Sequence, residues 1–237
     1  RMNYARNFGD HNVTAMAMYM MREYINSVLP QRNQGFSGRA TYDYANRYLV
    51  EFNFGYNGTE RLEAGSRYEF FPAMSLGWVA SNEKFWSPLL DVANYFKIRS
   101  SFGLVGSDET GLMAGAPHYL YLSDVNMSGG GSFESGISGG LTQQGPAVNS
   151  YPVNNACWER AVEFDVGADL QLFNQLNVTF DYFYNKRDRI LMKRASFPSI
   201  LGYQNAIPWA NIGKVDNQGF EVSLNWIKNF GNDWTID

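Results

Sequence analysis

The sequence has little charge, one cysteine and no long apolar run. Charged residues make up 18% of the 237 residues, below the roughly 25% of an ordinary soluble domain. The formal net charge of −4 excludes the basic surface of a nucleic-acid-binding protein. The single cysteine excludes an internal disulfide. A helical membrane protein is excluded because no run of about 18 apolar residues occurs.

Aromatic residues and glycine are abundant instead. The chain holds 17 Phe, 15 Tyr, 6 Trp and 23 Gly, and this aromatic content argues against disorder. The mean hydropathy is nevertheless −0.34. Such a value is typical of β-strands in which apolar and polar residues alternate and cancel in any average. The composition therefore leaves a β-rich globular domain or a membrane β-barrel.

A period of two runs through most of the chain. Between residues 35 and 44, Phe36 and Tyr42 share one face, and Arg39 and Asp43 share the other. This alternation indicates a strand with one apolar face, and its restart after residues 45–47 predicts a hairpin. The same period predicts eight strands, at residues 12–21, 35–44, 48–57, 68–80, 95–105, 158–172, 176–185 and 219–227. A ninth is expected to begin near residue 234, so we expect the sequence to be a piece of a longer protein.

Strand length and connection length separate a barrel from a sandwich. Several predicted strands exceed the roughly 5–6 residues of most soluble strands and match the about 9–11 of a spanning strand. The expected connections alternate between short (45–47, 81–94, 173–176, 229–233) and long (22–34, 57–67, 106–157, 193–214). Outer-membrane barrels have this alternation, with tight periplasmic turns and long outside loops. We favour an all-β, antiparallel transmembrane β-barrel fragment; a soluble glycan-binding β-sandwich is the alternative.

Several segments resemble the SusC/RagA-like TonB-dependent outer-membrane transporters. Residues 71–85 (FPAMSLGWVASNEKF) and 96–106 (FKIRSSFGLVG) carry the resemblance, and Trp158-Glu159 and residues 183–186 continue it in order. The most specific piece is residues 211–221, which fit the family pattern N-x-G-x-x-x-N-x-G-F/W-E at the start of a late barrel strand. The motif residues are Asn211, Gly213, Asn217, Gly219, Phe220 and Glu221. Their expected role is structural, with the two glycines where a long outside loop rejoins the wall.

The resemblance implies more than the residues do. It implies that residues 1–237 belong to the C-terminal half of a barrel of about 22 strands, with an N-terminal plug and a TonB-contacting segment outside this sequence. It also implies energy-coupled nutrient import across the outer membrane of a Gram-negative bacterium. The partners would be a SusD-like surface lipoprotein that acts as a lid and the TonB complex. An oligosaccharide is the commoner substrate of the family and a peptide the alternative. A passive porin-like barrel or a surface adhesin, both without a plug, is the competing class.

Residues that carry catalytic chemistry are few. The two histidines lie far apart, with no cysteine or carboxylate at zinc-ligand spacing. Cys157 has no nearby base. Residues 136–140 match G-x-S-x-G, but the strand and helix of a nucleophile elbow are not expected in so glycine-rich a loop. Asp165 and Asp169 share a strand face about 13 Å apart, too far for a glycosidase pair. We therefore predict no enzyme, no metal site and no cofactor.

The long loops hold the candidate binding residues. The 106–157 loop is rich in Gly and Ser, and loops of this length without secondary structure are usually functional or disordered. Its aromatic rings have flat apolar faces that suit stacking on a sugar or a peptide. The alternative is that the loop packs on its neighbours and binds nothing. The candidates for contact with substrate or lid, including two from residues 193–212, are Tyr119, Tyr121, Phe133, Tyr151, Tyr203 and Trp209.

Overall fold

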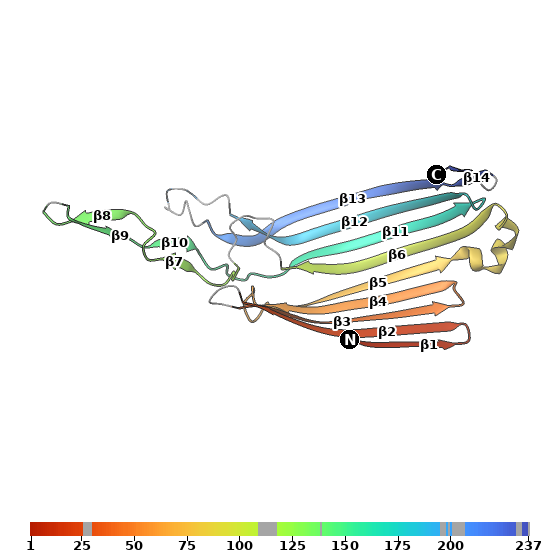
Figure 1. The fold of residues 1–237 in the computed structure, drawn as a ribbon, viewed down its shortest axis with the longest axis horizontal. Helices are drawn as coiled ribbons and strands as arrows, with labels where there is room; N and C mark the ends of the chain where they lie inside the picture. Colours follow the sequence, from red (N-terminus) through yellow and green to blue (C-terminus); the bar gives the residue numbers. More distant parts are fainter. Residues whose placement is uncertain are drawn as a thin grey trace.

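The computed structural model describes residues 1–25, 30–108, 118–137, 139–194, 198, 200, 207–230 and 234–236. Nine strands form one antiparallel sheet in the order β1-β2-β3-β4-β5-β6-β11-β12-β13 (Figure 1). Their bounds are β1 Met2–Phe8, β2 His11–Tyr24, β3 Gln31–Tyr44, β4 Tyr48–Thr59, β5 Tyr68–Val79, β6 Ala93–Ser107, β11 Glu159–Leu172, β12 Leu176–Lys193 and β13 Trp209–Trp226. Chain neighbours pair throughout, and β6 pairs with β11 across a long insertion.

All eight predicted strands are present, and the structure adds β1. Its partner is β2, from Met2 opposite Ala17 to Phe8 opposite His11. The sequence pattern missed β1 because Arg6 interrupts its apolar side, where the guanidinium lies 4.7 Å from the centre of the Phe8 ring. The ninth strand expected near residue 234 is β15 (Trp234–Ile236), which pairs with β14 (Lys228–Phe230) in a separate ribbon.

The expected start of the last long strand was wrong. β13 begins at Trp209, not near residue 219, so the motif at residues 211–221 lies inside the strand. Residues 211–219 are mainly polar or glycine and show no apolar face, which concealed the strand from the alternation. Gly213 lies where the β12–β13 register shifts, and a Cβ there would come within 2.7 Å of the Met192 sulfur. At Gly219 a Cβ would meet the Phe183 ring at 2.9 Å. The absence of a side chain at both glycines thus leaves room for side chains of β12.

Strand pairing continues past the apolar stretches at the long-loop end, so the loops are shorter than predicted. The β2–β3 connection covers residues 25–30 and the β4–β5 connection residues 60–67. Polar pairs extend the ladder there; Arg32 Nη2, for example, lies 2.9 Å from Glu23 Oε1. The β6–β11 insertion also has structure, since β7 (Asp124–Asn126) pairs with β10 (Ala147–Ser150) and β8 (Ser132–Ser135) with β9 (Leu141–Gln144). These ribbons form an arm that projects beyond the sheet (Figure 1).

The opposite end of the sheet has the short connections. Ala45 and Asn46 both have positive φ, as do Phe173 and Asn174, which is the backbone of a two-residue type I′ hairpin turn. The β5–β6 connection is longer and contains two 3-10 helices, η1 (Ala80–Asn82) and η2 (Lys84–Leu89). No helix in the described ranges is long and apolar enough to cross a membrane.

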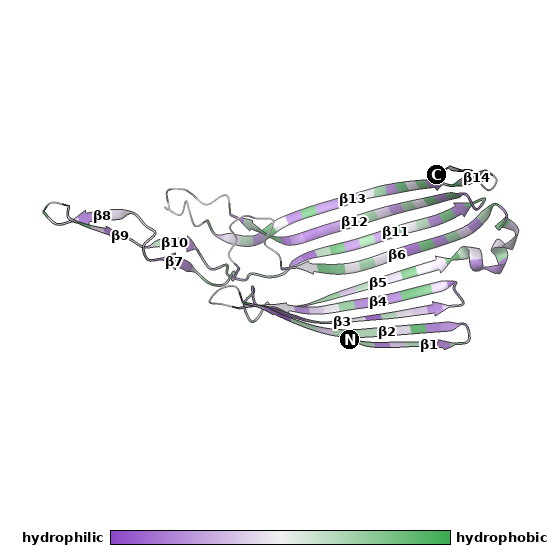
Figure 2. Ribbon diagram, viewed as in Figure 1, coloured by the Kyte–Doolittle hydropathy of each residue, from purple (hydrophilic) through white to green (hydrophobic). Residues whose placement is uncertain are grey.

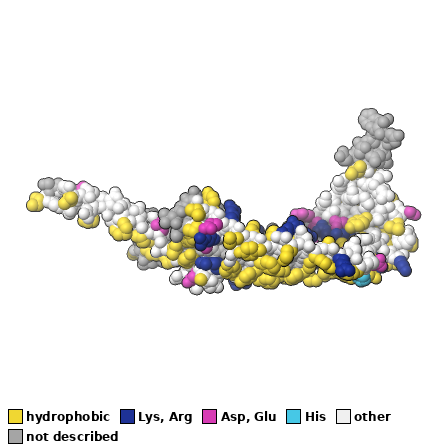
Figure 3. Space-filling model, turned by 60° about the horizontal axis from the view of Figure 1, so that its bottom comes forward, with side chains coloured by type: hydrophobic (Ala, Val, Ile, Leu, Met, Phe, Trp, Pro, Cys, Tyr) yellow, Lys and Arg dark blue, Asp and Glu magenta, His cyan; other side chains and the backbone are white. Residues whose placement is uncertain are grey.

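The register separates the sheet into two faces. Phe52, Met74, Phe102 and Phe164 lie opposite one another on β4, β5, β6 and β11. We call the side they share the apolar face and the other the polar face; hydropathy alternates along the strands (Figure 2). Hydrophobic side chains form a continuous band over the sheet (Figure 3), and Phe102 is 56% exposed. A sandwich would cover this face with a second large sheet, and the described residues form only two-stranded ribbons besides the nine-stranded sheet. Lipid covers such a face in a membrane barrel.

Candidate functional site

The polar face is organised around Arg99 of β6. Its Nε lies 3.2 Å from Asp169 Oδ2, its Nη1 3.5 Å from Asp165 Oδ1, and its Nη2 2.6 Å from Asp181 Oδ1. Gly167 lies between Arg99 and Asp181 in the register, and a Cβ at that position would come within 2.8 Å of the guanidinium carbon. The missing side chain therefore lets Arg99 reach across β11 to β12. Asp165 and Asp169 share one face, as predicted.

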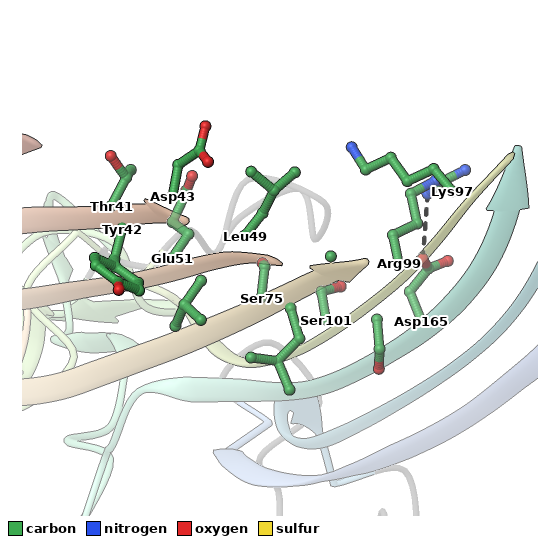
Figure 4. Close-up of a pocket in the computed structure, with 14 residues that line it drawn as sticks. Thr41, Tyr42, Asp43, Leu49, Glu51, Ser75, Lys97, Arg99, Ser101 and Asp165 are labelled. Carbon is green, nitrogen blue, oxygen red and sulfur yellow. Dashed lines mark hydrogen bonds and ion pairs between the residues drawn. The ribbon is translucent and has the colours of Figure 1, made fainter. Parts of the chain in front are cut away.

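A groove of about 480 Å³ lies beside this network. Thr41 and Asp43 of β3 point toward it, whereas Tyr42 points to the other side of the strand (Figure 4). Glu51 contributes a carboxylate that accepts a hydrogen bond from Arg39 at 2.5 Å. The remaining polar lining consists of Ser75, Lys97, Arg99, Ser100, Ser101 and Asp165. These hydroxyl, carboxylate and cationic groups can bind a hydrated polar solute.

The groove has no arrangement suited to acid–base or metal chemistry. Its nearest carboxylate cluster, Asp165 with Asp169 and Asp181, is already bound to the Arg99 guanidinium. Within the described ranges, no group of three or more His, Cys, Asp or Glu residues is placed to hold a metal ion. Ion pairing and hydrogen bonding are therefore the chemistry that this face offers.

A buried cluster joins the loops at the long-loop end of the strands. We call it the rim cluster; its members are Leu62, Phe71, Leu120, Val153, Ala156, Trp158, Leu191 and Trp209. The Trp158 ring is 4% exposed, packs edge-on against Phe71 at 5.3 Å, and donates from Nε1 to the Arg67 carbonyl at 3.0 Å. The Leu120 amide donates to the Arg61 carbonyl, and the Val153 amide to the Leu120 carbonyl. Both ends of the β6–β11 insertion are thereby fixed to the β4–β5 connection.

Asn211 of β13 joins β12 and the end of the β6–β11 insertion in the same region. Its Nδ2 donates to the carbonyls of Cys157, at 3.1 Å, and of Arg189, at 2.8 Å, while its Oδ1 accepts from the Cys157 amide at 3.2 Å. The other motif residues follow Asn211 along β13, toward the short-turn end of the sheet. Asn217 and Glu221 are opposite Asn185 and Asp181, and Phe220 is 74% exposed on the apolar face. Sequence reasoning found Asn211 but had no signal for its partners.

Two of the predicted aromatic residues lie together. Tyr119 and Tyr121 have ring centres 6.3 Å apart and line a second groove of about 540 Å³. Desolvation and the nearby Glu60 carboxylate raise the pKa of Tyr119, whose hydroxyl donates to the Pro30 carbonyl at 2.5 Å. Gln34 and Tyr68 also line the groove, and their positions in the register put them on the apolar side of the sheet. Tyr119 and Tyr121 thus lie at the long-loop end of β2, β3 and β4.

The other predicted aromatic residues are dispersed. Phe133 lies on β8 of the arm and is 57% exposed, and Tyr151 follows β10 and is half-buried. Trp209 was expected in an outside loop, but it begins β13 and is 6% exposed in the rim cluster, with the Lys193 ammonium 5.2 Å from its ring. Tyr203 and Ser138 lie outside the described residues. The five described candidates therefore do not form one site. Tyr119 and Tyr121 line the second groove, Phe133 and Tyr151 lie farther along the insertion, and Trp209 belongs to the rim cluster.

A family model matches nearly the whole chain, and curated relatives match about four-fifths of it. The family model for TonB dependent receptor-like β-barrels matches residues 2–237. TonB-dependent receptor P3 of Formosa agariphila is 27% identical over 79% of the chain and 17% of that protein. TonB-dependent receptor SusC of Bacteroides thetaiotaomicron is 27% identical over 80% of the chain and 18% of that protein. The chain thus spans about a sixth of the length of these relatives.

Solved structures share the fold. The RagAB peptide importer in its closed-closed state matches with a TM-score of 0.78, at 17% identity over 98% of this chain and 27% of that one. The siderophore receptor PirA of Pseudomonas aeruginosa matches with a TM-score of 0.59, at 11% identity over 98% of this chain and 39% of that one. The sheet with one lipid-facing side is therefore part of the wall of an outer-membrane barrel, and the chain belongs to the TonB-dependent receptor-like β-barrel family.

Proposed function

We propose that this chain forms part of the wall of an importer that takes up an oligosaccharide across the outer membrane. Uptake uses energy delivered by the TonB complex, and a SusD-like surface lipoprotein closes over the substrate. The observation that carries this proposal is the ordered polar face, with its ion network and its groove, behind a lipid-facing surface. Membership in the TonB-dependent family supports the energy coupling.

The chemistry of the polar face favours an oligosaccharide. Sugar hydroxyls donate and accept hydrogen bonds, so they suit a wall in which carboxylates, hydroxyls and cations are interspersed. Glu51, Ser75 and Ser101 provide such groups within one groove. The fold of the RagAB peptide importer keeps a peptide as the second candidate.

Labelled oligosaccharides and labelled peptides, supplied to cells that produce the full-length protein and its lipoprotein partner, test this function. We expect uptake of an oligosaccharide that stops when TonB is deleted. Uptake that continues without TonB would support a passive barrel and overturn the proposal. Uptake of peptides alone would overturn the choice of substrate and keep the energy coupling.

Two serines of the polar face provide a matched pair of variants for the same assay. Ser101 lines the groove, whereas Ser223 of β13, opposite Thr179, lies outside the groove lining. We expect Ser101→Trp to fill the groove and lower uptake, and Ser223→Trp to leave uptake close to that of the unmodified protein. Equal effects of the two variants would show that the groove has no part in transport.

A further inference from the structure

The β5–β6 connection differs from the other described connections at the short-turn end. The others turn within residues 9–10, 45–47 and 173–175, whereas this one covers residues 80–92. Its side chains are unusually apolar and open to solvent. Phe85 is 61%, Leu89 49%, Leu90 40% and Val92 48% exposed. A contiguous apolar patch of this kind marks an interaction surface.

This connection folds over the apolar face and not over the polar one. The Trp86 ring stacks on Phe96, with ring centres 5.1 Å apart and an angle of 12° between the planes. The Phe85 ring lies 6.3 Å from Trp78. Trp78 lies opposite Ile98, two residues from Phe96 and on the same side of β6, and Ile98 belongs to the apolar face. The exposed patch is therefore continuous with the surface that contacts lipid.

Polar contacts hold the connection in this position. Glu83 accepts a hydrogen bond from the Tyr48 hydroxyl at 2.7 Å and lies 3.3 Å from Arg47 Nη1. Asn82 Nδ2 donates to the Asn46 carbonyl at 2.7 Å, and Trp86 Nε1 donates to the Ala93 carbonyl at 3.0 Å. The side chains of Asn82, Glu83 and Trp86 thus have polar partners within the protein, and the apolar side chains of the segment are left as the outward surface.

We propose that residues 84–92, the interfacial segment, dock on the phospholipid surface of the periplasmic leaflet and fix the height of the barrel in the membrane. Short turns of outer-membrane barrels face the periplasm, which places the segment at that leaflet. Lys84 precedes the first apolar residue, Phe85, and Asp91 lies between Leu90 and Val92. A segment of this kind lies in the interface, with its apolar side buried about 5–10 Å at the boundary of headgroups and acyl chains. Continuity with the apolar face selects lipid over a protein partner.

Site-directed spin labelling tests the docking in the full-length protein, reconstituted in phospholipid vesicles with Cys157→Ser to remove the native thiol. One label is attached at Leu89→Cys. Two controls use Phe102→Cys on the apolar face and Asp10→Cys in the exposed β1–β2 turn. Collision with dissolved oxygen reports lipid contact, and collision with a water-soluble nickel chelate reports contact with water. We expect the nickel collision rate at position 89 to be about tenfold lower than at position 10, with high oxygen access as at position 102.

Two outcomes would overturn the proposal. Nickel access at position 89 equal to that at position 10 would place the segment in the periplasmic water. Protection from both nickel and oxygen would mean that protein, not lipid, covers the segment. The outcome does not depend on transport, because no substrate, TonB complex or surface lipoprotein takes part in the measurement.

Discussion

Replacement of Trp158 by alanine should release the β6–β11 insertion from the sheet. The indole is 4% exposed, packs on Phe71 and donates a hydrogen bond to the Arg67 carbonyl. Truncation of a buried tryptophan to alanine costs about 3–5 kcal/mol, of which the lost hydrogen bond contributes about 1 kcal/mol. Because the rim cluster joins loops to strand ends, we expect this loss to appear as local opening of the insertion.

Hydrogen exchange of the full-length protein in lipid nanodiscs measures this opening. The reporters are the amides of Leu120 and Val153, whose hydrogen bonds close the base of the insertion. A loss of 3 kcal/mol corresponds to roughly 100-fold faster exchange, because 1.4 kcal/mol is a factor of ten. Trp158→Phe keeps a six-membered aromatic ring but loses the hydrogen bond and part of the packed volume, so its exchange should rise less than that of Trp158→Ala.

Trp226→Ala is the matched control. Trp226 lies at the far end of β13 and is 46% exposed on the apolar face, so the exchange at the two reporter amides should not change. Unchanged exchange in Trp158→Ala would refute the reasoning, because it would mean that the rim cluster does not hold the insertion. Equal acceleration in Trp158→Ala and Trp226→Ala would show a global effect and refute it as well.

Three further predictions concern the two faces and the short-turn end. Phe102→Arg places a charge in lipid at a cost of about 2–4 kcal/mol and should lower the folded fraction on gels that separate folded from heated barrels; Ser101→Arg, on the polar face, should not. Arg99→Met leaves the three carboxylates unpaired and should lower the free energy of unfolding by about 1–3 kcal/mol, toward the lower end because the Arg99 side chain is 35% exposed. In urea unfolding, the added change Asp181→Asn should restore part of the lost stability. The Tyr48 hydroxyl and Arg47 lower the pKa of Glu83, so its contribution to stability is present at neutral pH and is lost as the pH falls through that lowered pKa. The protection of amides in residues 80–92, measured relative to their intrinsic exchange rate at each pH, should therefore fall in acid, and Glu83→Gln should remove most of this pH dependence.

The sequence by itself determined eight of the nine strands of the main sheet and their two faces. In a strand, the direction of a side chain depends only on whether its position is odd or even, so residues such as Phe52 and Glu51 were assigned to opposite faces without a structure. The alternation also predicted the tight turn at Ala45 and Asn46, because the strand patterns on both sides leave only three residues between them. The motif at residues 211–221 predicted the family, which the family model confirms.

Only the tertiary structure decided which residues meet. Arg99 and Asp181 are 82 positions apart, and Trp158 and Arg67 are 91 apart. Their contacts depend on the register of strands that pair across the β6–β11 insertion, and no local pattern encodes that register. The start of β13 was missed because its first residues are mainly polar or glycine. They continue the backbone hydrogen bonds to β12 but show no apolar face that alternation could reveal. Trp209 accordingly proved to be a packing residue of the rim cluster, although its residue type and its expected loop suggested a binding role.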